Sequence, residues 1–229
     1  MSSLEDTTKQ HYMYFYDPDY VTQMRVPGFD PHLDIAVLSG MLTPEQVNEH
    51  KLFEATKGEQ GTSYKKVRSK AKVVNFSGIY GAGPAKISLT TGMSLEEATL
   101  LHKIYWDRNK SVKQIAKDCV VKTIRNQMWL YNPVSGFWYS LRTDKDRFSC
   151  LNQGTGVYCF DTHIRNVRKQ GIKISLQYHD EIAFPLKVGQ ESNIEKILRD
   201  SIDAVNKKIK LNVPLGISVD FGNNYAEIH

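Results

Sequence analysis

Apolar residues recur at helical spacing along most of the chain, and the pattern is clearest over residues 191–209. There the apolar side chains fall on one face of a helix: Ile194, Ile197, Leu198, Ile202, Val205 and Ile209. Helices are also predicted over four further segments: residues 64–80, 94–109, 110–121 and 145–169.

Local start signals predict two shorter helices nearer the N-terminal end. Pro31 lies in the first turn of a helix over residues 30–38. Thr43 followed by Pro44 is an N-cap and first-turn pair, and it begins a helix that runs to about residue 56. The densely aromatic run over residues 11–20 is expected to end in a turn at Pro18.

Extended structure is predicted in the second half of the chain. Residues 124–141 place aromatic side chains around a turn at 132–136, which indicates a hairpin or an extended segment. Residues 172–186 alternate as in a β-hairpin, and residues 212–221 are typical of a final strand. This order of elements predicts an α+β fold in which a helical insertion interrupts a sheet domain.

The net charge of +5 is unevenly distributed. Residues 61–125 carry 13 Lys and Arg against 4 Asp and Glu, which makes this segment a candidate surface for a polyanion. No run approaches the roughly 18 uncharged apolar residues of a membrane span, and the acidic start is unlike a secretory signal. The three cysteines have no Cys-x-x-Cys spacing, which argues against zinc and for a reducing compartment.

The helix predicted over residues 64–80 carries Arg68, Lys72, Phe76 and Tyr80 at a spacing of four. Each step of four turns the helix by about 400°, so the side chains share one stripe. Cations at one end can hold phosphates, and aromatic rings at the other can stack on a base or sugar. The spacing alone also fits an amphipathic helix with both aromatic rings in the core and the cations at its edge.

Asp180 and Glu181 are adjacent carboxylates between the two apolar strands of the hairpin. An extended backbone sends neighbouring side chains to opposite faces, so the two acids cannot both be simple core groups. A buried carboxylate needs a partner, and a divalent cation is one. A hairpin turn with exposed acids is the alternative.

These two segments resemble motifs of the family A DNA polymerases, the group of DNA polymerase I and the phage replicative enzymes. The family's motif B reads Arg-x3-Lys-x3-Phe/Tyr-x3-Tyr-Gly, and this chain matches every anchor: Arg68, Lys72, Phe76, Tyr80 and Gly81. The string Gln-x-His-Asp-Glu over residues 177–181 is similar to motif C.

Further pieces of the chain agree with the same family. Asp30-Pro-His32 with Ala36 resembles its Asp-x-His-x3-Ala segment, and residues 153–155 resemble its Gln-Gly-Thr segment. Residues 223–229 resemble its Asn-Trp-x3-His terminus. The resemblance therefore covers nearly the whole chain.

The resemblance implies an antiparallel palm sheet with helices, interrupted by a helical fingers insertion. The implied domains are palm over 1–29 with a remnant of motif A, fingers over 30–140, and palm again over 141–229. The motif B helix is then at about 64–80 and the motif C hairpin at about 172–186. The implied activity is template-directed DNA synthesis, in which nucleotide is transferred from a dNTP to a primer 3′ end with two Mg²⁺ ions.

The resemblance also implies how the dNTP is bound. Arg68 and Lys72 would bind the triphosphate, and Lys72 would act as general acid to the pyrophosphate leaving group. Phe76 would pack on the sugar, and Tyr80 would stack near the template base. Glu5 would be the steric gate against a ribose 2′-hydroxyl.

On the primer-template side, the resemblance makes Asp180 the metal ligand and a catalytic residue, with Glu181 supporting it. His179 and Gln177 would place the primer terminus. Gln153 would read the minor groove, and Gly81 would give room beside the template base.

The chain departs from the family at several positions. Residues 2–5 fit the Ser-x-Leu-Glu part of motif A, but its catalytic Asp would stand just before Met1, and Asp6 and Thr7 replace the usual Leu-Arg. Lys145 and Ser149 stand where the family usually has Arg and Asn. We therefore expect little activity from this chain alone. We also expect that an upstream polymerase chain supplies the thumb, the motif A Asp and possibly an exonuclease. An intron or a split intein, which would make this a split polymerase, and a misassigned start codon would each give this boundary.

Two other functions fit the same residues. A non-catalytic remnant could bind DNA or a replication partner, and a single-subunit RNA polymerase shares the Arg/Lys helix and the His-Asp hairpin. Glu5, and the spacing of Phe76, Tyr80 and Gly81, favour DNA synthesis. The resemblance to phage-type enzymes suggests a bacteriophage protein and implies a cytoplasmic location, which is that of a bacterial host if the chain is phage-encoded.

Overall fold

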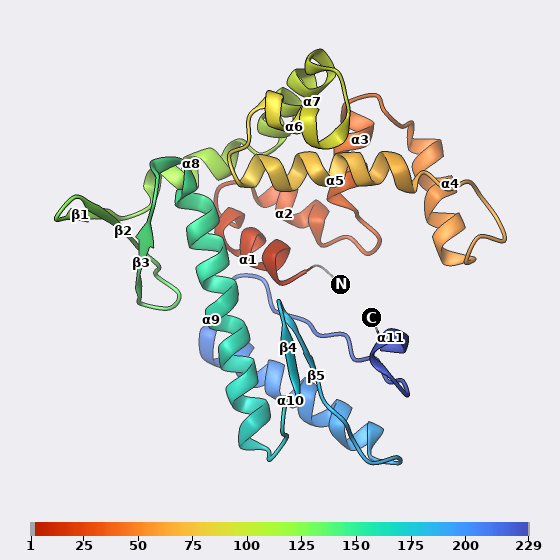
Figure 1. The fold of residues 1–229 in the computed structure, drawn as a ribbon, viewed down its shortest axis with the longest axis vertical. Coiled ribbons are helices and arrows are strands. Elements are labelled where there is room, and N and C mark those ends of the chain that lie inside the picture. Colours follow the sequence, from red (N-terminus) through yellow and green to blue (C-terminus); the bar gives the residue numbers. More distant parts are fainter. Residues whose placement is uncertain (1–2, 229) are drawn as a thin grey trace. The chain divides into compact units, whose positions relative to one another are not determined.

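The computed structural model describes residues 3–228, in which helices dominate and two small antiparallel sheets are present (Figure 1). The described chain forms two compact units. The sheet unit comprises residues 3–15, 120–141 and 150–228, and the helical unit comprises residues 16–119 and 142–149. The α+β class is therefore confirmed.

The helical unit is built from short helices that mostly begin at a proline or a capping side chain. Its elements are α2 (Pro18–Met24), α3 (Pro31–Leu38), α4 (Pro44–Ala55), α5 (Lys65–Ile79), α6 (Pro84–Thr91), α7 (Leu95–Arg108), α8 (Lys110–Asp118) and the 3₁₀ turn η1 (Asp144–Asp146). Both α4 and α7 begin with a capping box, formed by Thr43 with Gln46 and by Ser94 with Glu97. Each box satisfies two first-turn donors, which is why the sequence marks these starts clearly.

Helix α5 packs against α3, α6 and α7 (Figure 1). An apolar cluster joins α3 to α5, with Leu33, Ala36, Leu42 and Ala71 buried in it. On the α7 side, a Cβ on Gly78 would lie 2.2 Å from a ring carbon of Tyr105. Only a glycine allows α5 to approach α7 this closely.

The sheet unit contains α1 (Leu4–Met13), β1 (Val121–Ile124), β2 (Gln127–Tyr131), β3 (Trp138–Leu141), α9 (Arg147–Lys169, within this unit from Cys150), β4 (Leu176–Tyr178), β5 (Glu181–Ala183), α10 (Glu191–Ile209) and α11 (Tyr225–Ile228). Strands β1, β2 and β3 form an antiparallel meander in that order. In its register, Leu130 of β2 lies opposite Val121 and Tyr139.

The second sheet pairs β4 with β5 and packs against helices α9 and α10 (Figure 1). Val167 of α9 and Ile194 and Leu198 of α10 form the buried part of this cluster. A neighbouring cluster is centred on Cys159 and Val205, and Leu4 of α1 packs against it. These contacts fix the hairpin and the start of α1 within one unit.

Most predicted elements are confirmed, but residues 212–221 are not a strand. Ile217 and Val219 show the expected alternation, yet the backbone there is assigned no regular structure. A strand requires a partner backbone, and residues 216–221 make no backbone–backbone hydrogen bond within the described chain. The alternation predicted which side chains of this segment are buried, but it could not show whether another strand pairs with it.

The N-terminal aromatic run also differs from its prediction. Residues 11–20 are the end of α1 and the start of α2, and Pro18 is the first residue of α2. The Asp17 carboxylate caps this helix, since it accepts the Tyr20 N–H at 3.2 Å. Proline is well tolerated at a first helical position, where its missing N–H is not needed.

The two compact units divide the chain at different residues from the predicted domains. The divisions fall after Phe15, Cys119, Leu141 and Ser149, whereas the sequence placed them after residues 29 and 140, so residues 16–29 lie in the helical unit and residues 120–140 in the sheet unit. Buried Asn132 explains why residues 120–140 belong to the sheet unit, because its Nδ2 donates to the Leu151 carbonyl at 3.1 Å and to Thr155 Oγ1 at 2.8 Å on α9. These bonds attach the β1–β3 sheet to α9.

Candidate active site

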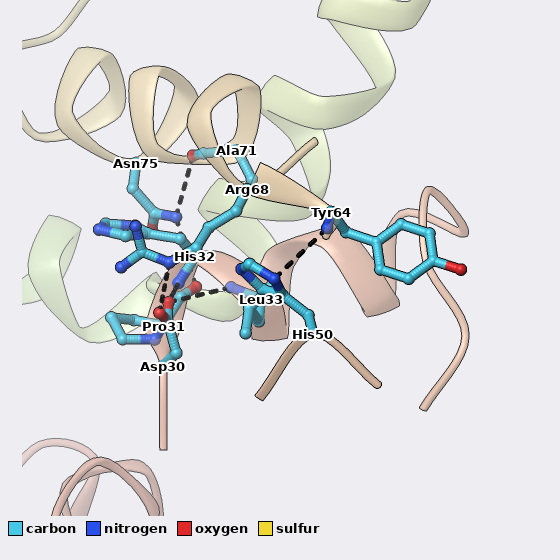
Figure 2. Close-up of polar contacts among 9 residues, drawn as sticks. All are labelled: Asp30, Pro31, His32, Leu33, His50, Tyr64, Arg68, Ala71 and Asn75. Carbon is cyan, nitrogen blue, oxygen red and sulfur yellow. Dashed lines mark hydrogen bonds and ion pairs between the residues drawn. The ribbon is translucent and has the colours of Figure 1, made fainter. Parts of the chain in front are cut away.

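The predicted stripe on α5 begins with an ion pair between Arg68 and Asp30 (Figure 2). Arg68 Nε donates to Asp30 Oδ2 at 2.6 Å. The other carboxylate oxygen of Asp30 caps α3, since it accepts the N–H groups of His32 and Leu33 at 2.8 and 3.1 Å. One carboxylate therefore fixes both the start of α3 and the direction of the Arg68 guanidinium.

The environment of Asp30 favours its charged form. Burial by itself raises the pKa of this carboxyl, but the hydrogen bond and charge of Arg68 and the two backbone N–H groups outweigh burial and lower it. The ion pair is consequently present at neutral pH. In this ion pair the Arg68 side chain remains 35% exposed.

The rest of the stripe continues along the exposed side of α5. Lys72 is exposed and its Nζ lies 5.7 Å from the centroid of the Phe76 ring, which is half-buried. Phe76 also contacts His32, since the centroids of the two rings lie 5.8 Å apart. Tyr80, just after the helix, is 41% exposed. The alternative that places both aromatic rings in the core is therefore wrong for Tyr80.

Asn75 and His50 are structural residues of this region that the sequence patterns did not indicate (Figure 2). Asn75 is buried, and its Nδ2 donates to the carbonyls of Pro31 and Ala71 at 3.3 and 3.2 Å. His50 Nδ1 accepts the N–H of Tyr64 at 3.3 Å, at the start of α5. Both act through tertiary contacts, for which a sequence has no local signal.

Gly81 follows Tyr80 with a backbone φ of 68°, a conformation that favours glycine. A Cβ at this position would lie 3.5 Å from Cδ of Lys145, an ordinary contact. The space beside Gly81 is thus bordered by Lys145, one of the residues at which the chain departs from the family pattern. The backbone conformation, more than the space, requires a glycine here.

In the sheet unit, His179 and Asp180 form the two-residue turn between β4 and β5. His179 has a φ of 49°, which is uncommon for a residue with a side chain, and its ring lies 4.4 Å from that of Tyr178. Asp180 is exposed in the turn and Glu181 is half-buried at the start of β5. The structure therefore agrees with the alternative of a hairpin turn at Asp180, and both acids line one cavity.

This cavity has a volume of about 590 Å³, and the described residues that line it all belong to the sheet unit. Glu181 also acts on Tyr225 of α11, since desolvation and the Glu181 carboxylate raise the pKa of this phenol. Gln177 lies in β4, opposite Ile182 of β5. The structure thus brings Asp180 and Glu181 to one cavity, with Gln177 and His179 on the same hairpin.

Glu5 and Gln153 lie in the sheet unit as well. Glu5 is half-buried in the first turn of α1, and its carbonyl accepts Asn152 Nδ2 at 3.1 Å. Gln153, the next residue on α9, is exposed. The hydrogen bond brings the first turn of α1 against the part of α9 that carries Gln153. Met1, Ser2 and His229, used in the two terminal resemblances, lie outside the described residues.

Metal ligation by this chain alone is not supported by the geometry. Within residues 3–228 no group of three or more His, Cys, Asp or Glu side chains is arranged to hold a metal ion. Asp180 and Glu181 supply two carboxylates at most, and Mg²⁺ held by few protein ligands binds weakly. The residues present do not fit the two Mg²⁺ ions without a further carboxylate.

In the described part of the chain, no helix combines the length and apolarity needed to cross a membrane.

The fold matches that of part of a DNA polymerase domain. The chain is similar in structure to the POL domain of Pol1 from M. smegmatis, solved in complex with DNA primer-template and dNTP, with a TM-score of 0.67 and 18% identity. The similarity covers 99% of this chain and 39% of that one. No family model matches the chain.

Sequence relatives carry the name DNA polymerase I. The chain is 23% identical to the protein of Borreliella burgdorferi over 195 residues, which covers 78% of this chain and 21% of the relative. It is 26% identical to the Helicobacter pylori protein over 181 residues, covering 72% of this chain and 20% of the relative. The chain therefore spans about a fifth of the length of the curated relatives it matches.

Proposed function

We propose that this chain is the palm and fingers part of a family A DNA polymerase, which transfers a nucleotide from a dNTP to a primer 3′ end. The observation that carries the proposal is the stripe on α5, in which Arg68 is held by Asp30 and followed by exposed Lys72 and Tyr80. Cations and aromatic groups ordered along one helix suit a ligand with a phosphate end and a base or sugar end.

The α5 residues have distinct roles in this proposal. Arg68 and Lys72 bind the triphosphate, and Lys72 donates a proton to the pyrophosphate as it leaves, which offsets charge as it develops. Phe76 packs on the sugar, Tyr80 stacks near the template base, and Gly81 leaves room beside it. The exposure of Lys72 supports its role, since its ammonium group is accessible to a ligand.

The sheet-unit residues serve the primer and the reacting groups. His179 and Gln177 position the primer terminus, and Gln153 contacts minor-groove acceptors, which all correct base pairs share. Glu5 excludes a ribose 2′-hydroxyl. The half-buried position of Glu5 at the start of α1 supports a steric role rather than a solvated one.

The proposal includes two Mg²⁺ ions in the complete enzyme, with Asp180 as one ligand and Glu181 beside it. Once held by the completed set of ligands, the ions would supply Lewis-acid stabilisation of phosphate charge. The remaining carboxylate comes from an upstream polypeptide that carries motif A and the thumb, because residues 3–228 do not provide a set of three ligands. The chain by itself is then nearly inactive. The phage origin and the cytoplasmic location stay predictions.

Primer extension tests the proposal. The purified chain should not extend a primed template at an ordinary rate, and it should do so when the polypeptide encoded upstream is added. Asp180→Ala should abolish the reconstituted activity, and exposed Asp203→Ala is the matched control that should retain it. Extension by the chain alone, or full activity in Asp180→Ala, would contradict the proposal.

A second pair of variants tests the α5 stripe. Lys72→Ala should slow extension by about a hundredfold or more, the usual effect of losing a general acid, and leave DNA binding nearly unchanged. Lys66→Ala removes an exposed lysine from a different face of α5 and should have little effect. DNA binding without extension in the reconstituted enzyme would favour a binding remnant. Preferential incorporation of ribonucleotides would favour an RNA polymerase.

A further inference from the structure

The antiparallel meander of β1, β2 and β3 has one buried face and one face that is largely exposed (Figure 1). Residues paired across the strands share a face, because side chains alternate along each strand. Leu130 is fully buried on the inner face, where its partner Tyr139 donates its hydroxyl to the Gly154 carbonyl of α9 at 3.3 Å. The opposite face, which we call the Trp138 face, carries six side chains: Lys122, Ile124, Trp129, Tyr131, Trp138 and Ser140.

Aromatic rings gather on the Trp138 face. Tyr131 and Trp138 are direct partners in the sheet, and their ring centroids lie 5.2 Å apart. Trp138 is 37% exposed, and Trp129 on the neighbouring strand is half-buried. The Nζ of Lys122, which comes from β1, lies 3.7 Å from the centroid of the Trp138 ring on β3. A cation over a ring face is favourable, so Lys122 occupies a position where a flat ligand could also stack.

The charge around the Trp138 face has one sign. Residues 120–141 contain two cations, Lys122 and Arg125, and neither Asp nor Glu. Neither cation has a carboxylate partner within residues 3–228. Arg125 is exposed in the tight turn between β1 and β2, where Arg125 and Asn126 have φ values of 49° and 62°. A turn of this kind matches the twist of a hairpin, so it holds Arg125 at the end of the sheet. The face therefore complements an anion.

Single-stranded DNA supplies both groups that this face suits. Its bases present flat surfaces that stack on aromatic rings, and its backbone presents a phosphate at every step. A DNA duplex keeps the flat surfaces of its bases inside the stack, so it would contact the cations without using the rings. An acidic peptide would likewise pair with the cations and leave the cluster of rings without a partner.

We propose that the Trp138 face binds a segment of single-stranded DNA, with a base stacked on Trp138 and phosphates beside Lys122 and Arg125. The base replaces the Lys122 ammonium over the Trp138 ring, and the freed Lys122 side chain reaches a neighbouring phosphate. The six residues of this face include none of those assigned to the dNTP, the primer terminus or the metal ions, so the site goes beyond the proposed function. The choice of DNA over RNA rests on that function.

Binding of a labelled oligo-dT of about ten nucleotides to the full chain, followed by fluorescence anisotropy, tests the site. Trp138→Ala should weaken this binding about fivefold or more, which is the lower end of the effect of one stacked base. The affinity for a blunt duplex of the same length should stay unchanged. Lys122→Ala should lower the slope of log K against log salt concentration by about 0.7, the contribution of one phosphate contact on a single strand.

Three further variants separate stacking from damage to the fold. Trp138→Phe keeps a flat ring and should retain most of the affinity for oligo-dT. Phe15→Ala removes a ring that is 79% exposed outside the Trp138 face, and Lys207→Ala removes an exposed cation of α10. Both of these controls should bind oligo-dT as the wild type does. Urea unfolding of Trp138→Ala, followed by circular dichroism, checks that the variant is folded under the binding conditions.

Several results would overturn the inference. One is unchanged oligo-dT affinity in folded Trp138→Ala, and another is an equal loss of affinity for the duplex. Tighter binding of oligo-rU than of oligo-dT would assign the face to RNA, and tighter binding of polyglutamate would assign it to an acidic protein. A dimer in sedimentation that Trp138→Ala disrupts would assign it to a second copy of the chain.

The result can be separated from the outcome for the proposed function. Oligo-dT binding through Trp138, in a chain that extends no primer when the upstream polypeptide is added, would keep this inference and contradict the proposed function. Primer extension, together with unchanged oligo-dT affinity in Trp138→Ala, would do the reverse.

Discussion

Replacing Asp30 tests whether one carboxylate both caps α3 and holds Arg68. Asp30→Ala removes the cap, at about 1 kcal/mol, and the charge-assisted bond to Arg68, which we put at about 1 kcal/mol because the pair is partly exposed. Asp30→Asn keeps the cap, since Asn caps as well as Asp, and loses only the charge. The expected losses in unfolding free energy are therefore about 2 and about 1 kcal/mol.

Thermal and urea unfolding followed by circular dichroism would measure these losses. For a chain of this size they correspond to a lowering of Tm by about 4–8 °C and about 2–4 °C. Glu54→Ala, an exposed acid of α4 without an ion pair in the structure, is the matched control and should stay within about 0.5 kcal/mol. A cycle with Arg68→Gln should give a coupling of about 1 kcal/mol.

The pH dependence provides the sharpest check. Since the folded pKa of Asp30 lies below its unfolded value of about 3.9, the stabilisation by Arg68 is complete above that pH. It is lost as the pH falls through the folded pKa, where the carboxyl becomes neutral. Wild type and Asp30→Asn should therefore converge in stability at low pH. A difference that persists there, or an equal loss for Ala and Asn at pH 7, would refute the reasoning.

Three further predictions concern packing and thiol chemistry. Gly78→Ala should destabilise the chain by about 3 kcal/mol or more in urea unfolding, because its Cβ would overlap the Tyr105 ring; a neutral result would mean that α5 and α7 separate easily. Asn132→Ala should cost about 3 kcal/mol and raise hydrogen exchange in β2, since its Nδ2 makes two bonds to α9 and its Oδ1 accepts two N–H groups. Burial raises the pKa of Cys159 to about 12, so at pH 8 only about one thiol in ten thousand is ionised; half-buried Cys150 should react with iodoacetamide much faster, and equal labelling would contradict this.

Local signals predicted most of the helices. Thr43 and Ser94 each bond within four residues, and helix α10 was predicted with its observed bounds, Glu191–Ile209, because its apolar positions keep one period throughout. Helix α6 was not predicted, although Pro84 is its first residue, since its short sequence has a weak apolar pattern. Capping residues and apolar periods predict helices well because the residues that interact are within one or two turns of each other in the sequence.

The sequence predicted the stripe of side chains in the candidate site, but it did not predict their contacts. The spacing of four placed Arg68, Lys72, Phe76 and Tyr80 on one stripe of α5. The pairing of Arg68 with Asp30, 38 residues earlier in the chain, needed the packing of α3 on α5. His163 is buried and has no hydrogen-bond partner among residues 3–228, and this too had no sequence signal, since its environment is made by distant segments.

The sequence by itself determined where helices begin, which side chains share a helix face, and the order of motif-like segments, because these depend on bonds and periods of a few residues. Tertiary structure alone decided that Asp30 serves both α3 and Arg68, and that Asn132 attaches the β1–β3 sheet to α9. It also decided that residues 216–221 make no backbone–backbone hydrogen bond within residues 3–228. The physical reason is that a hydrogen bond or a strand pairing needs two partners at contact distance. A pattern along one segment defines which groups of that segment can interact, and only the folded chain shows which partners they contact.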